Sequence, residues 1–159
     1  MSTDTSLASR SHEENWLPIL ELATVEVFEI MLGCRVKPAS SEHVVNWEFT
    51  AMVGLAGALC GVLTVRCDAE TARQVAKSML GDTADAGQQV ADALGEICNM
   101  IAGNFKNKLA GTDERCLLSV PTVISGGEYR FHSLADGESL ETVVLLEAAP
   151  VAVRLQLKR

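Results

Sequence analysis

The sequence lacks the hydrophobic segments typical of membrane and secreted proteins. No apolar run among its 159 residues is long enough to span a bilayer, and residues 1–14 contain no apolar stretch like that of a signal peptide. Positive charge is also scarce, with 13 Lys and Arg against 21 Asp and Glu and a formal net charge of −8. Because this charge repels phosphate groups, we expect neither nucleic acid nor an anionic membrane as a partner.

Aromatic residues are few, at 4%, whereas apolar residues together make up 48%, so we expect an aliphatic core. The length predicts one domain over residues 14–159, preceded by a poorly ordered polar tail over residues 1–13. The five cysteines are scattered and odd in number, which favours neither disulfides nor a metal site. We therefore expect a cytoplasmic protein without a metal of its own. The three histidines are equally scattered and predict no catalytic triad.

A predicted helix from Val90 to Leu109 has an apolar face and a distinctive polar strip. A rotation of 100° per residue groups the apolar residues Val90, Leu94, Ile97, Ile101 and Phe105. On the other side, the same rotation places four residues within one narrow strip: Asp92, Glu96, Asn99 and Gly103. Measured around the helix axis from Glu96, they lie at roughly −40°, 0°, −60° and −20°, respectively. Glycine inside a helix costs about 1 kcal/mol relative to alanine, so Gly103 indicates close approach of another surface. A polar face that only meets water is the alternative that spacing leaves open.

The pattern Asp92-x-x-x-Glu96-x-x-Asn99-x-x-x-Gly103 resembles the signature of the CheC/CheX/FliY family of chemotaxis phosphatases. The resemblance continues through Asn104-Phe-Lys106 and Ser119-Val-Pro121-Thr-Val-Ile-Ser-Gly126, which is similar to the CheX branch, and covers most of residues 14–159. Members of this family remove the phosphoryl group from the aspartate of CheY-type receiver domains. The resemblance therefore implies a response-regulator phosphatase with no cofactor of its own and with Mg²⁺ carried by the receiver.

The resemblance also implies roles for individual residues. Asn99 would orient the attacking water, because a carboxamide can accept a hydrogen from water and donate one to a phosphoryl oxygen without adding charge. Glu96 would pair with the receiver lysine and so fix the register of docking. Further candidate partner contacts are Asp92, Met100, Gly103 and Lys106. The alternatives are a solvated acid or a helix N-terminal charge for Asp92, a partly buried core residue for Met100 and a solvated lysine for Lys106.

A faint repeat relates the first predicted helix to this one. When the sequence is aligned with itself at an offset of 70 residues, the four strip residues align with Leu22, Glu26, Glu29 and Gly33. Duplication and chance explain this agreement equally well. CheC/CheX-like folds are described by such a pseudo-duplication, and CheC-type members keep two sites. Because Glu26-x-x-Glu29 lacks the carboxamide, as in the CheX branch, we expect the first helix to pack and not to catalyse.

The expected fold is a two-layer α+β fold that resembles the CheC/CheX fold and consists of two pseudo-duplicated halves, each a helix followed by strands. We expect a largely antiparallel sheet of six or seven strands with two long helices on one face. Besides the helix at Val90–Leu109, we predict helices at Trp16–Leu32 and from an Asp68 cap to Leu80, with Asp85 and Gln88 as a capping box for the long helix. Predicted strands are Val44–Val53, Ala58–Arg66, Cys116–Ile124, Glu128–His132, Leu140–Glu147 and Val151–Leu157. Predicted turns are Gly54–Gly57, Ser125–Gly127, Ala135–Gly137 and Ala149–Pro150. A single helix over Ala51–Val65 is the alternative to the first hairpin.

The strongly apolar segments Val143–Leu146 and Val151–Leu155 could leave an edge available for pairing. Because CheX-like proteins are known for dimerising through their sheets, we expect a homodimer. The runner-up function is a non-enzymatic module, resembling the flagellar-switch relatives, that binds a receiver or switch component. A small-molecule hydrolase or metalloenzyme is a third possibility that no motif supports.

Overall fold

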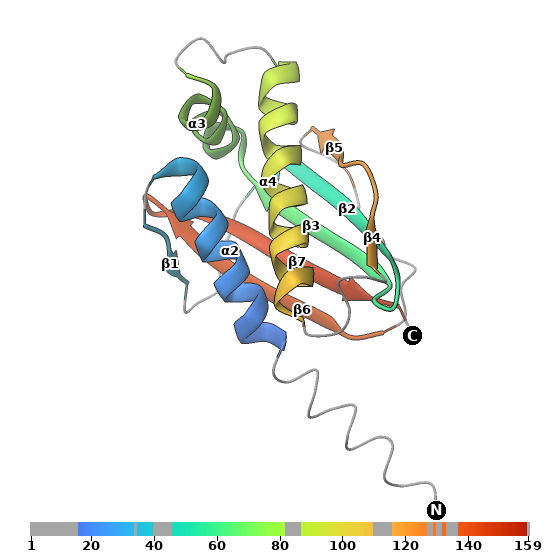
Figure 1. The fold of residues 1–159 in the computed structure, drawn as a ribbon. Helices are drawn as coiled ribbons and strands as arrows, with labels where there is room; N and C mark the ends of the chain where they lie inside the picture. The colour runs from blue at the N-terminus through green and yellow to red at the C-terminus, as the bar shows by residue number, and fades with distance from the viewer. Residues whose placement is uncertain are drawn as a thin grey trace, which may run out of the picture.

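The computed structural model describes residues 16–33, 35–39, 46–81, 87–109, 116–126, 129, 132 and 137–158. The predicted tail, residues 1–13, lies outside them, so the division into a tail and one domain stays a prediction. The described helices are α2 (Trp16–Leu32), α3 (Ala69–Leu80) and α4 (Gly87–Lys108) (Figure 1). The strands are β1 (Lys37–Pro38), β2 (Phe49–Gly57), β3 (Gly61–Cys67), β4 (Cys116–Leu118), β5 (Thr122–Ser125), β6 (Ser139–Leu146) and β7 (Ala149–Leu157).

The strands form one antiparallel sheet in the order β1-β6-β7-β3-β2-β4, with β5 also pairing with β2. Reading the sheet order backwards exchanges β1 with β4 and β5, β6 with β2, and β7 with β3. Each exchanged pair holds the same place in the chain order of its half, which is β1, β2, β3 in the first half and β4 with β5, β6, β7 in the second. The helices obey the same exchange, because α2 packs on β6 and α4 packs on β2. The seven-stranded α+β fold with pseudo-duplicated halves is therefore confirmed, and α3 is the connection between them.

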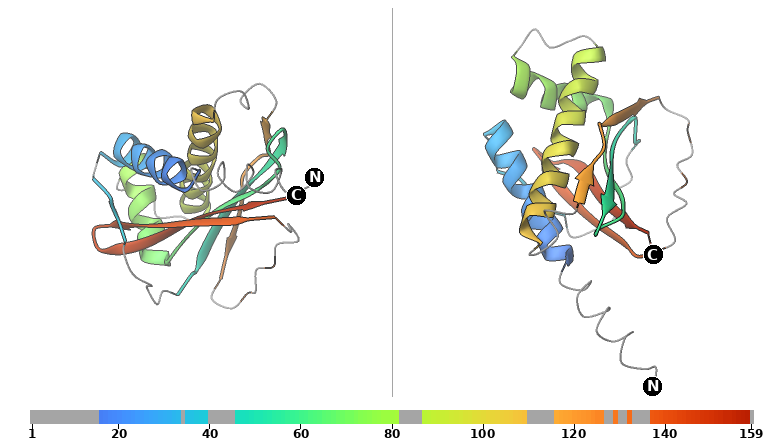
Figure 2. Two further views of the ribbon diagram at one scale, coloured as in Figure 1. Left: turned by 90° about the horizontal axis from the view of Figure 1, so that it is seen from below. Right: turned by 45° about the vertical axis from the view of Figure 1, so that its right-hand side comes forward.

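Helices α2 and α4 lie side by side on one face of the sheet (Figure 2, left). Period-two alternation along the strands turns every second side chain toward them. Trp16 of α2 meets Phe105 of α4 edge to face, with ring centroids 6.3 Å apart. The largest fully buried side chains are Phe28, Phe105, Leu20, Leu63, Leu94, Ile97, Ile101, Leu146 and Leu155. The predicted aliphatic core is thus the layer between helices and sheet.

The helix ends follow the predicted local signals. Gly33, with φ of 65°, ends α2 and donates its N–H to Glu29 O at 3.0 Å. The Asp68 carboxylate caps α3 by accepting from the Thr71 N–H at 2.7 Å. Gly81 follows the last turn of α3. The capping box proposed for α4 depends on residue 85, which lies outside the described residues.

The first hairpin forms, and the alternative of one helix over Ala51–Val65 is wrong. The predicted turn at Gly54–Gly57 is also wrong, because β2 continues through these glycines and the connection to β3 lies at 58–60. The backbone of Gly54 is satisfied within the sheet: its N–H donates to Ser119 Oγ at 2.8 Å and its carbonyl accepts from the Ser119 N–H at 2.9 Å. At its other end β2 begins at Phe49, later than predicted.

In the second half, the single strand predicted at Cys116–Ile124 is interrupted. Residues 119–121 separate β4 from β5, and Pro121 has no N–H for a ladder. Of the strand predicted at Glu128–His132, only residues 129 and 132 are described, and neither lies in a strand. The turn predicted at Ala149–Pro150 is wrong, because Glu147 and Ala148 turn the chain with φ of 48° and 70°. Two positive φ values are typical of the tight turn that matches the twist of a hairpin.

The strands predicted to form a dimer edge are not edges over those residues. Strand β7 lies between β3 and β6, and Val144 and Leu145 of β6 pair with β1. The outer strands are instead β1 on one side and β4 with β5 on the other. The edge argument is therefore wrong for Val143–Leu146 and Val151–Leu155, while the homodimer itself stays a prediction.

No helix in the described part of the chain combines the length and the apolar character needed to cross a bilayer.

Candidate functional site

The polar strip predicted from helical rotation is present on α4. Its opposite face is anchored by buried side chains, so α4 is fixed in rotation. The side chains of Asp92 and Glu96 are exposed, and Asn99 and Gly103 are half-buried. The structure thus brings all four residues together on the side of α4 that faces away from the core.

In the part of the chain that the structure describes, Glu96 and Asn99 have no internal partner. Within the described residues, no hydrogen bond or ion pair engages either side chain. Asp92 differs, because its Oδ1 accepts a hydrogen bond from Gln88 Nε2 at 2.8 Å, one turn earlier on the helix. A carboxylate and a carboxamide three residues apart on a helix lie about 5–6 Å apart at their Cβ atoms. Both are therefore available to one external partner.

One side of the strip is walled by the chain itself. The segment Cys116–Val123, which includes β4, runs beside α4 (Figures 1 and 2). Between α4 and the far end of this segment lies a groove of about 480 Å³. It is lined by Gln88, Ala91, Asp92, Gly95, Glu96, Val120, Pro121 and Val123. The candidate site is thus a strip of helix bordered by an apolar wall, which helix rotation alone did not predict.

Gly95 allows this wall to approach the helix. A Cβ placed on Gly95 would lie 3.3 Å from Pro121 Cβ and 3.5 Å from Val123 Cγ2. At Gly103, where the sequence predicted close approach, the nearest atom to an added Cβ would be Leu118 Cδ1 at 3.9 Å, an ordinary contact. A side chain at position 95 would therefore press on the wall, whereas one at position 103 would make only an ordinary contact. Sequence reasoning missed Gly95, although a second mid-helix glycine beside Glu96 was the available signal.

Two of the predicted partner contacts have internal neighbours. Lys106 Nζ donates to the carbonyl of Cys116 at 2.7 Å, which ties the start of the wall to the last turn of α4. Met100 is half-buried and packs against the core. The expected roles of Lys106 and Met100 at a partner interface stay predictions, and each side chain has a structural role besides.

The equivalent strip on α2 is tied to α4. Glu26 Oε2 accepts from Lys108 Nζ at 2.8 Å and from Asn104 Nδ2 at 2.9 Å. These hydrogen bonds, with that to Lys108 the stronger influence, hold the pKa of the Glu26 carboxyl below its usual value. Glu29, which occupies the position of Asn99, is exposed. The arrangement agrees with a packing role for the first helix.

The cysteine next to the strip is unsuited to nucleophilic chemistry. Cys98 is buried, and its Sγ lies 3.6 Å from the carbonyl of Leu63, which accepts its hydrogen bond. Burial raises the pKa of this thiol to about 12, so that the reactive thiolate is not populated near neutral pH. In the described residues, no group of three or more His, Cys, Asp or Glu could hold a metal ion.

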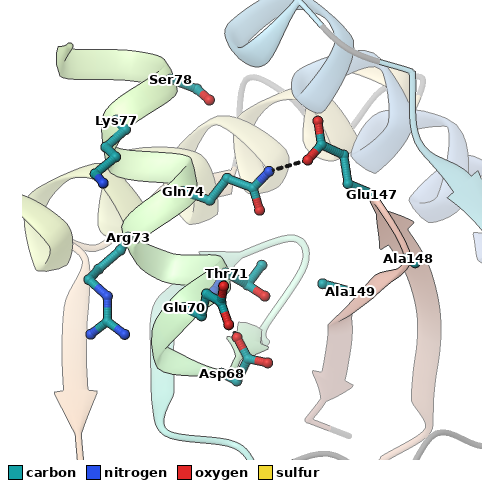
Figure 3. A pocket seen from close by; sticks show the side chains of 10 residues that line it. All are labelled: Asp68, Glu70, Thr71, Arg73, Gln74, Lys77, Ser78, Glu147, Ala148 and Ala149. Atoms are coloured by element: carbon teal, nitrogen blue, oxygen red, sulfur yellow. Dashed lines mark hydrogen bonds between the residues drawn. The ribbon is translucent and has the colours of Figure 1, made fainter. Parts of the chain in front are cut away.

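A larger cleft lies elsewhere, between α3 and the β6–β7 turn (Figure 3). It has a volume of about 760 Å³, and Gln74 Nε2 donates to Glu147 Oε2 across it at 2.6 Å. Its charged lining mixes both signs, with Arg73 and Lys77 as well as Asp68, Glu70 and Glu147. None of the predicted site residues lines it. The mixed charge points to no ligand class, so α4 carries the candidate site.

Comparison with known proteins gives an independent result. The family model described as "Chemotaxis phosphatase CheX" matches residues 49–144, more than half of the chain. The CheY-P phosphatase CheX of Thermotoga maritima is 28% identical over 100 residues, which cover 61% of this chain and 64% of that protein. The match thus spans slightly less than two thirds of the relative's length.

Two solved structures show the same fold. CheX from Desulfovibrio desulfuricans has a TM-score of 0.78 and 24% identity, covering 91% of this chain and 99% of that chain. The CheX-CheY-BeF₃-Mg²⁺ complex from Borrelia burgdorferi has a TM-score of 0.73 and 25% identity, covering 91% of this chain and 98% of that chain. The family match contains the whole of α4 and the wall beside it.

Proposed function

This chain belongs to the CheX family of chemotaxis phosphatases, and from that premise we propose that it hydrolyses the aspartyl phosphate of a CheY-like response regulator. The observation that carries the proposal is the pair of side chains on the polar strip of α4, Glu96 and Asn99, which no described residue engages. Two relatives support it by their names: one is a CheY-P phosphatase, and the other was solved with CheY, BeF₃ and Mg²⁺.

Asn99 would supply the chemistry. An acyl phosphate on a receiver, neutralised by the receiver's own Mg²⁺, needs a well-placed water more than a new nucleophile. The Asn99 carboxamide can accept one hydrogen of that water through its oxygen and donate to a phosphoryl oxygen through its nitrogen. It carries no charge that the phosphoryl group would repel. Its half-buried position on a rigid helix limits the freedom it must lose on binding.

Glu96 would supply the docking register. As a carboxylate beside an anionic phosphoryl group it would be repelled, so its useful partner is a cation on the receiver, the lysine that the resemblance implies. Pairing one turn away from Asn99 fixes the rotation and translation of the receiver along α4. A register error of about 1 Å is enough to lower the rate on the order of 100-fold.

The remaining strip residues would complete the interface. Asp92 uses one carboxylate oxygen for Gln88 and keeps the other for a partner. Gly103 has space above it and would let the receiver approach the helix. Lys106 and Met100 stay candidate contacts at its edge. The protein needs no metal of its own in this mechanism.

The test separates catalysis from docking. Asn99→Ala should lower single-turnover decay of a phosphorylated receiver by about 10²- to 10³-fold, as for comparable electrostatic positioning groups, with receiver affinity nearly unchanged. Glu96→Ala should lower the rate and also weaken binding, measured with the BeF₃⁻–Mg²⁺ form of the receiver. Asn107→Ala, an exposed asparagine on the same helix, is the matched control.

The same measurements distinguish the proposed phosphatase from the runner-up, a non-enzymatic binding module. Wild-type decay rates in Asn99→Ala would eliminate the water-positioning role. Receiver binding by a wild-type protein that does not accelerate decay would leave a non-enzymatic binding module of the same fold.

A further inference from the structure

The apolar wall beside α4 ends in an unusual side chain. Val120 is 84% exposed, more than any other large apolar side chain in the described part of the chain. It lines the same groove as Glu96 and Asp92, so two carboxylates face an aliphatic group across a groove. Valine exposed this fully contributes little to the stability of the isolated protein.

The backbone under Val120 is held firmly. Its neighbour Ser119 makes two hydrogen bonds to Gly54, one through the backbone N–H at 2.9 Å and one accepted by the hydroxyl at 2.8 Å. The next residue, Pro121, has a fixed φ and lies so close to Gly95 that a Cβ added there would be 3.3 Å from Pro121 Cβ. A side chain presented from such a rigid segment loses little further entropy when it becomes buried.

We propose that Val120 is a positioning residue that anchors the phosphorylated receiver beside Glu96. The inference rests on the proposed function, because the occupant is the receiver whose phosphoryl group must reach Asn99. A receiver seated on Glu96 covers the groove, and the opposite wall of that groove is Val120. Burial of the valine against an apolar part of the receiver, next to the cation that pairs with Glu96, gives the interface an anchor that is not screened by salt.

A second exposed aliphatic residue on the same segment offers a matched control. Leu117 is 74% exposed in β4, between the buried Cys116 and the half-buried Leu118. Because side chains alternate along a strand, Leu117 points to the face of the sheet opposite α4. It shares with Val120 its exposure and its apolar character, and it does not line the groove.

The experiment compares Val120→Ser, Val120→Ile and Leu117→Ser in the full-length chain, using the stand-alone CheY-type receivers of the same organism. Val120→Ser should raise KM for the phosphorylated receiver, and Kd for its BeF₃⁻–Mg²⁺ form, by about tenfold. The decay rate at saturating protein should change less than about twofold, since Asn99 is intact. The conservative variant Val120→Ile and the control variant Leu117→Ser should both have the wild-type KM.

Several results would overturn the inference without touching the proposed function: wild-type KM and Kd in Val120→Ser, an equal loss in Leu117→Ser, or a loss confined to the saturated rate. If the wild-type chain binds the receiver without accelerating decay, the proposed function fails, and the Kd comparison alone decides the role of Val120. If the wild-type chain neither binds a receiver nor accelerates decay, both proposals are rejected.

Discussion

Replacing Gly103 by alanine tests whether the polar strip of α4 meets another protein. Glycine in the middle of a helix is a cost to stability, and no described atom of the chain lies close enough to require it there. The remaining reason for the glycine is an external surface that approaches α4. Gly103→Ala should therefore make the isolated protein more stable and make receiver binding weaker.

The magnitude follows from the surroundings of the residue. An added Cβ would lie 3.9 Å from Leu118 Cδ1, an ordinary contact, so no steric term offsets the helix propensity. We expect a gain of about 0.5–1 kcal/mol in the free energy of unfolding, or roughly 1–4 °C in Tm for a chain of this size. At a closely packed interface the same methyl group overpacks by about 1–3 kcal/mol, which corresponds to roughly 5- to 150-fold in KM.

Gly95→Ala is the matched contrast on the same helix. Its methyl group would lie 3.3 Å from Pro121 Cβ, and the proline ring cannot rotate away. Overpacking of about 1–3 kcal/mol then exceeds the propensity gain of about 1 kcal/mol, so this variant should be less stable than wild type. Thermal unfolding and single-turnover receiver dephosphorylation, measured on both variants, complete the comparison.

The Tm and the KM of Gly103→Ala test two different parts of the argument. A lower Tm in Gly103→Ala would refute the packing argument, whereas a higher Tm with unchanged KM would show that no partner packs closely at this position. The predicted combination of higher stability and weaker binding cannot arise from a damaged fold.

Three further predictions concern the first helix and the assembly. The folded-state pKa of Glu26 lies below its ordinary value of 4.5, so its contribution to stability is present above that pH and is lost as the pH falls through the folded pKa. The Tm of Glu26→Gln should therefore fall less steeply than that of wild type between about pH 5 and pH 3, with Glu29→Gln as control. Glu26→Ala combined with Glu29→Ala should leave phosphatase activity largely intact, and a loss as large as that of Asn99→Ala would make α2 a working site. Light scattering at micromolar concentration should give twice the 17.0 kDa chain mass, and a monomeric mass would contradict the predicted homodimer.

The sequence by itself determined the features that depend on local geometry. Helical rotation places Glu96 and Asn99 on one strip whatever the rest of the chain does, and the structure keeps them there. The same holds for the ends of α2 and α3, because a cap such as Asp68 satisfies an N–H only three residues away. The repeat between Glu26 and Glu96 was ambiguous as sequence and became clear in the symmetric strand order.

Only the tertiary structure decided what surrounds the strip. Gly54 resembled a turn residue because its partner, Ser119, lies 65 residues away and cannot be found by any local pattern. For the same reason the sequence could not predict that Pro121 would rest on Gly95 or that Lys106 would hold the start of β4. Long-range strand pairing sets these contacts, and it depends on which segments compete for each sheet position. Local periodicity therefore placed Glu96 and Asn99 on one strip of α4, and the family resemblance implied their chemistry. The packing of Cys116–Val123 against α4 shaped the surface that a partner would meet.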